Sequence, residues 1–368
     1  MIPAPSRSIV VRPSASAPSA APRWAHAWEQ ALDAIAQGTL PAALARAAFA
    51  NLAAGTPEAD ARVAFLEALA AQSAGDVVDA GQRAHRALGL APDGASAAFR
   101  AHAHALCAAT HDAVADPAGA RPHLDAAVAA LAEAPDAVAA VAAILGPLLA
   151  AHGEVGSAED LLQRALAALP DGPRRTGVRL ALASVRTADG RPDAALPLLV
   201  SALSACRVGP ACIARIQAEF GVAHAAAGRD GLAHHHFRAA LEIHLGHGQN
   251  AEAGALHLAI ARLHAAASAR DEALAAIDAA LSVVGATSGH AVARAASQLA
   301  YRVYKAAGDP ARALAALEAA VAAEEVHTRA LLQSRAAFSC PLASADSVAP
   351  HPLASDAFDA DPTVESLW

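Results

Sequence analysis

Residues 217–241, QAEFGVAHAAAGRDGLAHHHFRAAL, predict two short amphipathic helices joined by a turn around Gly228. In the second helix, Ala233, Phe237 and Ala240 follow the i, i+4, i+7 spacing that places side chains on one helix face. A helix pair of this size cannot bury its own apolar face, so it requires neighbouring copies against which to stack. The stretch therefore predicts a repeat protein.

The turn residue marks the copies along the chain. From one mark to the next the interval is 37 to 40 residues, which is the signature of a solenoid in which each unit contacts its neighbours. The eight marks are Gly38, Gly75, Ala115, Gly153, Gly190, Gly228, Ser268 and Gly308.

The second helix of each unit repeats in register with the mark. A small residue, a packing residue and a second small residue follow each of the last seven marks, so that two helices approach closely around the packing side chain. In the last three units these residues are Ala233, Phe237 and Ala240, then Ala273, Ile277 and Ala280, then Ala313, Leu317 and Ala320.

The pattern resembles the tetratricopeptide repeat (TPR) family. The resemblance covers roughly residues 60–325 and is best in the Gly228 unit, which carries Phe220, Gly221, Gly228 and the residues of its second helix named above. Most units lack the family's large aromatic residue early in the first helix, and the period exceeds the usual 34 residues. The fold expected is all-α, a right-handed superhelical solenoid of antiparallel helix pairs with about 7–8 repeats.

The composition favours the same organisation. We expect residues 1–23 to be a disordered lead, 24–338 to be the array with a capping helix, and 339–368 to be a disordered acidic tail. The net charge of −8 gives no sign of a nucleic-acid or membrane partner. The apolar run Val138 to Ala151 fits a buried first helix better than a membrane span. Cytoplasmic location with reduced thiols is expected, with a Cys206–Cys212 disulfide as the alternative.

In tetratricopeptide arrays the first helices line a concave, peptide-binding groove. The resemblance therefore places the residue six before each mark in that groove, namely Ser184, Val222, Arg262 and Arg302. Gln298, Arg302 and Lys305 share one helix face, and Arg262 with Arg302 could hold a carboxylate of a peptide. The arrangement resembles a carboxylate clamp without its usual asparagines; ordinary solvated surface is the alternative.

The chain contains 18 histidines, which are candidate metal ligands. His234, His235 and His236 point about 100° apart in a helix, so they cannot chelate one ion together. His244 and His247 have the right spacing for two ligands but lack a third beside them. We therefore expect no metal and no cofactor, with metal or nucleotide handling as a third, weaker hypothesis. Motifs of nucleotide-binding sites and of serine hydrolases are absent, so no catalytic residue is expected.

The last helix, about Ala311 to Phe338, is longer than the others, with Val321, Leu331 and Leu332 on one side and Glu324 and Glu325 on the other. It resembles helical linkers to output domains in bacterial signalling proteins; a cap on the last repeat is the alternative. The main hypothesis is a non-enzymatic scaffold that binds a partner peptide or helix in its groove. The second is a regulatory module that signals through its last helix, possibly as a homodimer.

Overall fold

A computed structural model describes residues 57–73, 76–92, 95–134, 137–206, 209–288 and 290–339. The expected N-terminal lead, the unit around Gly38, the mark Gly75 and the acidic tail from residue 340 onward lie outside the described residues. The described residues contain helices only, as α3 to α16. The prediction of an all-α solenoid is confirmed.

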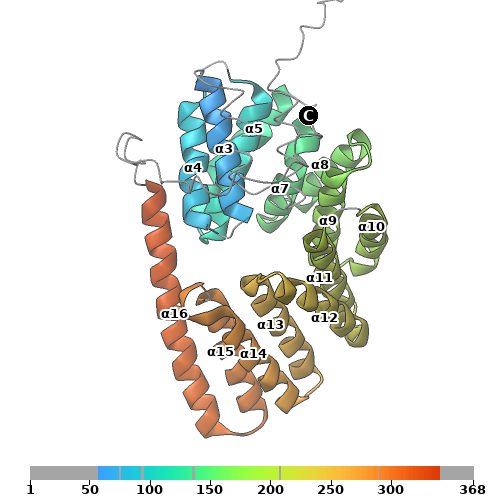
Figure 1. Cartoon of the computed structure of the whole chain (residues 1–368), viewed down its shortest axis with the longest axis vertical. Coiled ribbons are helices and arrows are strands. Elements are labelled where there is room, and N and C mark those ends of the chain that lie inside the picture. The colour runs from blue at the N-terminus through green and yellow to red at the C-terminus, as the bar shows by residue number, and fades with distance from the viewer. Residues whose placement is uncertain are drawn as a thin grey trace, which may run out of the picture.

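Consecutive helices form seven antiparallel pairs that follow one another along a curved array (Figure 1). In chain order the pairs are α3 (Pro57–Ser73) with α4 (Val77–Leu90), α5 (Ala97–Ala113) with α6 (Pro117–Glu133), α7 (Val138–Ala151) with α8 (Val155–Ala168), α9 (Pro173–Ala188) with α10 (Pro192–Ala205), α11 (Pro210–Ala226) with α12 (Asp230–Gly246), α13 (Asn250–Ala266) with α14 (Arg270–Ser288), and α15 (His290–Ala306) with α16 (Pro310–Ser339).

The turn residues adopt the backbone conformation that the repeat requires. Six of the marks have a positive φ, between 53° and 88°, which ends the first helix in the left-handed region. They are Ala115, Gly153, Gly190, Gly228, Ser268 and Gly308. Glycine enters this region without steric cost, whereas Ala115 and Ser268 adopt it against their own preference. Stacking of the neighbouring helices therefore fixes the turn even where the residue does not favour it.

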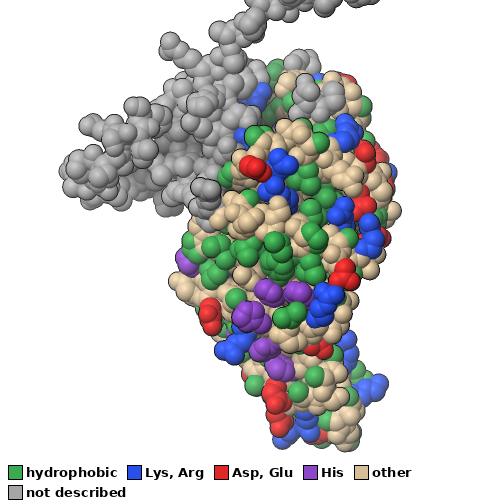
Figure 2. Space-filling view, turned by 90° about the vertical axis from the view of Figure 1, so that its right-hand side faces the viewer, with side chains coloured by type: hydrophobic (Ala, Val, Ile, Leu, Met, Phe, Trp, Pro, Cys, Tyr) green, Lys and Arg blue, Asp and Glu red, His purple; other side chains and the backbone are tan. Residues whose placement is uncertain are grey.

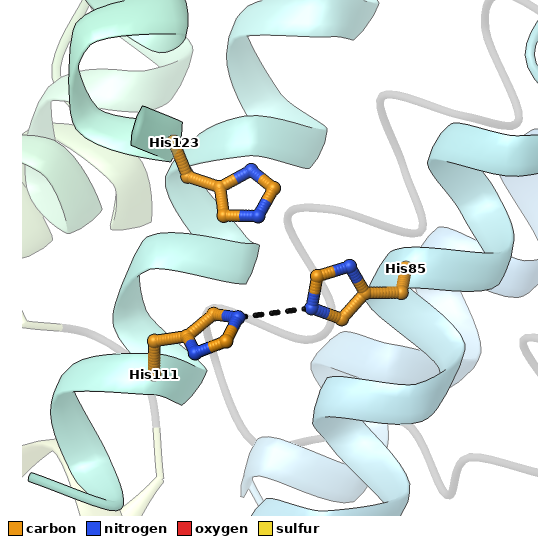
Figure 3. Close-up of side chains that lie close together, drawn as sticks. All are labelled: His85, His111 and His123. Carbon is orange, nitrogen blue, oxygen red and sulfur yellow. Dashed lines mark hydrogen bonds between the residues drawn. The ribbon is translucent and has the colours of Figure 1, made fainter. Parts of the chain in front are cut away.

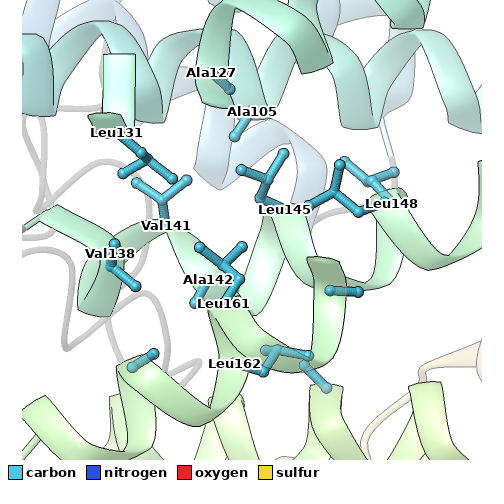
Figure 4. Close-up of a cluster of buried hydrophobic side chains, with 14 of the residues drawn as sticks. Ala105, Ala127, Leu131, Val138, Val141, Ala142, Leu145, Leu148, Leu161 and Leu162 are labelled. Carbon is cyan, nitrogen blue, oxygen red and sulfur yellow. The ribbon is translucent and has the colours of Figure 1, made fainter. Parts of the chain in front are cut away.

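The small and large positions of the second helices form the core between units. Ala233, Phe237 and Ala240 are all buried, and the corresponding residues of α4, α6, α8, α10 and α14 are buried as well. Leu317 differs, with 40% of its surface exposed, because no further repeat among the described residues packs on the outer side of α16. Around α7, side chains of successive units interlock into one continuous cluster (Figure 4).

The last helix also connects the two ends of the described array. α16 has 30 residues, about 45 Å at 1.5 Å per residue, and its end lies against α4 (Figure 1). The Arg335 guanidinium donates to the carbonyl oxygens of Val114 (3.0 Å) and Ala115, and Gln82 donates to the carbonyl of Ala337 at 3.3 Å. The expectation that each unit contacts only its neighbours is therefore wrong at this point.

The apolar stripe of α16 does not cover the last repeat. Val321 and Leu332 are 53% and 57% exposed, and Leu331 is half-buried. It is Glu324, from the side expected to face solvent, that accepts hydrogen bonds from Arg294 (3.5 Å) and Gln298 (3.4 Å) of α15. Alanines rather than the larger residues approach α15, because the two helices of a pair pack closely.

We predict that Gly221→Ala destabilises the protein by about 1–3 kcal/mol. A Cβ at this position would lie 2.4 Å from the ring of Phe237, so the α11–α12 pair would have to open. Gly177→Ala, in the first helix of the preceding pair, is the matched control: its Cβ would meet Ala143 at an ordinary 4.0 Å. The control should gain up to about 1 kcal/mol from helix propensity. Urea unfolding followed by circular dichroism measures both; equal effects would contradict the prediction.

Candidate functional site

The concave side of the array contains a cleft of about 1520 Å³. The first helices of six successive pairs contribute to its lining: α3, α5, α7, α9, α11 and α13. They do so because each pair repeats the same orientation, which brings equivalent helix faces side by side. The cleft is therefore a product of the repeat rather than of any one unit.

The described residues that line the cleft carry more positive than negative charge. Four arginines, Arg174, Arg179, Arg215 and Arg262, face two carboxylates, Asp171 and Glu252, which leaves an excess of two positive charges with histidines neutral. The whole chain has a net charge of −8. The cleft is thus a positively charged surface in an acidic protein. It attracts anionic ligands more strongly than the rest of the molecular surface does.

Arg179 is largely enclosed by the surrounding protein. Its Nη2 donates to Asp171 at 3.1 Å, and its side chain is only 11% exposed. Its Nη1 is buried without a hydrogen-bond partner among the described residues. A buried donor without a partner costs free energy that a ligand oxygen would recover. This atom is a candidate contact for an anionic group.

The structure brings only part of the sequence-predicted anchor to the cleft. Val222 and Arg262 line it, and both are exposed, whereas Ser184, Gln298, Arg302 and Lys305 do not belong to its lining. Gln298 instead contacts Glu324 of α16. Arg302 and Lys305 follow Gln298 on the same helical face, and the Lys305 ammonium lies over the Tyr301 ring at 5.6 Å.

Sequence analysis missed Arg174, Arg179 and Arg215 as cleft residues. Their positions within the units differ, and the rule of counting six residues back from the mark does not select them. Arg174 and Arg179 come near the start and middle of α9, and Arg215 near the start of α11. The curvature of the array brings them together, and spacing alone contains no such signal.

Two cysteines also belong to the cleft. Cys206 and Cys212 line it and are free thiols, so the alternative of a disulfide between them is not what the structure shows. Burial and the hydrogen bond with Cys206 together raise the pKa of the Cys212 thiol to about 12, although the positive charge of Arg215 opposes them. Cys107 is buried in the core, as expected for a structural thiol.

Histidines gather on the outer face of the array (Figure 2). Of those weighed from the sequence, His236 stacks on Phe220 and His224, with ring centroids 4.9 and 5.3 Å apart, and contacts Gln217 Oε1 at 2.6 Å. His235 is exposed, and His234 meets His264 edge to face. His224 is therefore a packing residue. A separate group of histidines on α4, α5 and α6, which sequence analysis did not consider, is described below.

Comparison with solved structures identifies the architecture. A Rap protein complexed with Competence and Sporulation Factor matches with a TM-score of 0.61 and 14% identity, over 86% of this chain and 91% of that one. A monomeric mutant of IFIT1 with Gppp-AAAA matches with a TM-score of 0.58 and 17% identity, over 83% and 70%. The chain has a tetratricopeptide-like repeat fold. A tetratricopeptide repeat protein from Parabacteroides merdae aligns more weakly, at TM-score 0.48, 12% identity, and 75% and 99% coverage.

At these levels of identity the matches establish the fold of this tetratricopeptide-like array and no more. No family model and no curated protein matches the sequence. Among the helices that the structure describes, none is both long and apolar enough to cross a membrane.

We predict that Cys212 of the folded protein reacts with iodoacetamide at pH 8 at least about 100-fold more slowly than in the urea-unfolded chain. The thiolate is the reactive form, and a pKa near 12 leaves very little of it at this pH. Arg215→Ala should slow the reaction further, because the charge that lowers this pKa is removed. Peptide mass spectrometry measures labelling over time. Equal rates in the folded and unfolded chains would contradict the burial of this thiol.

Proposed function

We propose that the protein is a non-enzymatic scaffold that holds an extended segment of a partner protein in the cleft. The observation that carries the proposal is the excess of arginine on the lining of this cleft in a chain of net charge −8. The segment would carry acidic side chains or a free C-terminal carboxylate, since guanidinium groups bind carboxylates through paired hydrogen bonds. Extended segments in grooves are a recurring mode of peptide recognition.

The positions of the charges support a segment rather than a small anion. Arg179 lies on α9, Arg215 on α11 and Arg262 on α13, three successive first helices of the array. Neighbouring packed helices lie about 8–10 Å apart. Three charges on three successive first helices therefore span a distance well beyond the reach of a single carboxylate. Apolar residues between them, such as Val222, Leu256 and Ala259, offer surface for side chains of the partner.

The partner is better matched by a peptide than by a nucleic acid. Gppp-AAAA is present in the IFIT1 structure, but here the net charge of −8 opposes the approach of a polyanion. A peptide with a few acidic groups gains the local attraction of the cleft without that long-range cost. Binding of an RNA oligonucleotide to the protein as tightly as the acidic peptides selected below, measured in the same affinity assay, would overturn this part of the proposal.

The test is selection of binders from a displayed random peptide library, followed by affinity measurement with the enriched peptides. We predict that the enriched peptides are acidic and that Arg215→Glu/Arg262→Glu weakens their binding at least about 10-fold. Arg302→Glu/Lys305→Glu is the matched control: it makes the same charge change outside the cleft and should leave affinity within about twofold. Circular dichroism checks that both variants fold. Equal loss in the two variants, or no enriched peptides, would refute the cleft as the binding surface.

A second candidate function is regulation through α16, and it is favoured by one observation. The end of α16 lies on α4 and on the turn after α5, while Val321, Val326 and Leu332 along its length are exposed. A ligand that changes the curvature of the array would alter this contact and present the exposed side chains to an output protein. Homodimerisation through this helix and the cytoplasmic location stay predictions.

For this second function we predict that a cleft-binding peptide changes hydrogen exchange of residues 330–339 at the end of α16. Arg335→Ala, which removes the hydrogen bonds to Val114 and Ala115, should change peptide affinity more than Arg329→Ala at an exposed position of the same helix. Hydrogen exchange measured by mass spectrometry, with and without peptide, shows whether peptide binding in the cleft is coupled to the end of α16. Unchanged hydrogen exchange together with unchanged peptide affinity would refute regulation through α16, and only the scaffold function would remain.

A further inference from the structure

Four histidines meet where the first two described repeats join. His85 comes from α4, His104 from α5, His111 from the end of α5 and His123 from α6. Donor nitrogens of His85, His111 and His123 all lie within 4.8 Å of one another. Figure 3 shows their three rings pointing toward a common space between the helices. We propose that His85, His111 and His123 bind a divalent transition-metal ion of the zinc class.

The separation of the donor atoms suits such an ion. The Nε2 atoms of His85 and His111 are 3.1 Å apart. In a tetrahedral zinc site with bonds of about 2.0–2.1 Å, two ligand nitrogens are separated by roughly 3.3 Å. The two rings therefore need to move apart by only a few tenths of an ångström, and His123 needs a small rotation to complete the set. Three imidazoles leave one position for water.

Two neighbouring groups orient the ligands. Asp116 Oδ2 lies 2.9 Å from His111 Nδ1, so the carboxylate fixes the ring and leaves Nε2 free toward the space. His104 Nδ1 lies 3.0 Å from His123 Nδ1, which leaves the other nitrogen of His123 free in the same way. Carboxylates and other acceptors that hold the outer nitrogen of a histidine are characteristic of metal sites.

Asp116 is itself held by the repeat. Its Oδ1 accepts a hydrogen bond from the backbone N–H of Gly119 at 3.1 Å, which caps the start of α6. The carboxylate is thus positioned by the turn after Ala115 and not by the histidines alone.

The end of α16 lies beside this group. The ring of Phe338 is 5.3 Å from that of His111 and 6.3 Å from that of His85, and it packs where a Cβ of Gly81 would otherwise lie. An apolar neighbour of this kind limits water around an ion and strengthens its interactions. Among the described residues, no other group of histidines, cysteines and carboxylates brings three such donors together. His224 and His236 differ from this group, because their rings stack face to face and do not direct donor nitrogens toward a common point.

The test uses the full chain without a histidine tag, freed of metal by a chelator. Zn²⁺ is titrated by calorimetry, and Co²⁺ is used as a spectroscopic probe because its visible absorption distinguishes four-coordinate from six-coordinate sites. We expect one Zn²⁺ per chain, bound at micromolar concentration or tighter, and a Co²⁺ spectrum of the four-coordinate type. Zn²⁺ should also raise the melting temperature.

Variants decide whether these residues are the ligands. His85→Gln/His123→Gln should weaken binding at least about 100-fold, and Asp116→Asn, which keeps the helix cap, by about 10–100-fold. His234→Gln/His235→Gln, two histidines of α12, is the control and should bind like the unchanged protein. No Zn²⁺ binding at 100-fold excess over protein, or equal loss in the control, would overturn the proposal. So would unchanged binding in a folded His85→Gln/His123→Gln variant.

Discussion

Close contact between the two helices of each pair is the constraint on which the rest of the structure depends. Gly221 shows it most directly, because its missing Cβ makes room for the ring of Phe237. Alanines on both sides of that ring let the next pair approach equally closely. A left-handed residue in the turn after six of the described first helices then returns the chain at the required angle. Curvature, cleft and surface all follow from repeating this contact.

The repeat places functional groups that no single unit contains. The four arginines of the cleft come from three helices, and their shared environment exists because equivalent helix faces are stacked in layers. In the proposed function, the positively charged cleft would attract anionic segments, whereas the net negative charge of the chain would repel polyanions in general. Selectivity would then depend on the length and charge spacing of the bound segment. Buried donors such as Arg179 Nη1 add a penalty for ligands that leave them without a partner.

Contact between α16 and α4 changes how the array can respond to a ligand. In an open solenoid, a change in one unit affects mainly its neighbours. Here Arg335 and Phe338 tie the last pair to the second helix of the first described pair and to the turn after α5. A change in curvature has to strain or release that contact. The histidines lie at the same junction, so an ion bound there would stiffen the surface against which α16 packs.

The sequence by itself determined the helical repeat, its period and its core. The turn marks and the spacing of Ala233, Phe237 and Ala240 are local patterns, and helix pairing depends on residues a few positions apart. Tertiary structure alone decided that Arg179, Arg215 and Arg262 line one cleft, that Glu324 faces α15, and that α16 reaches α4. It alone brought His85, His111 and His123 together from three helices. These outcomes depend on the accumulated rotation from one repeat to the next. That rotation is set by small differences in packing, which the sequence of a single unit does not reveal.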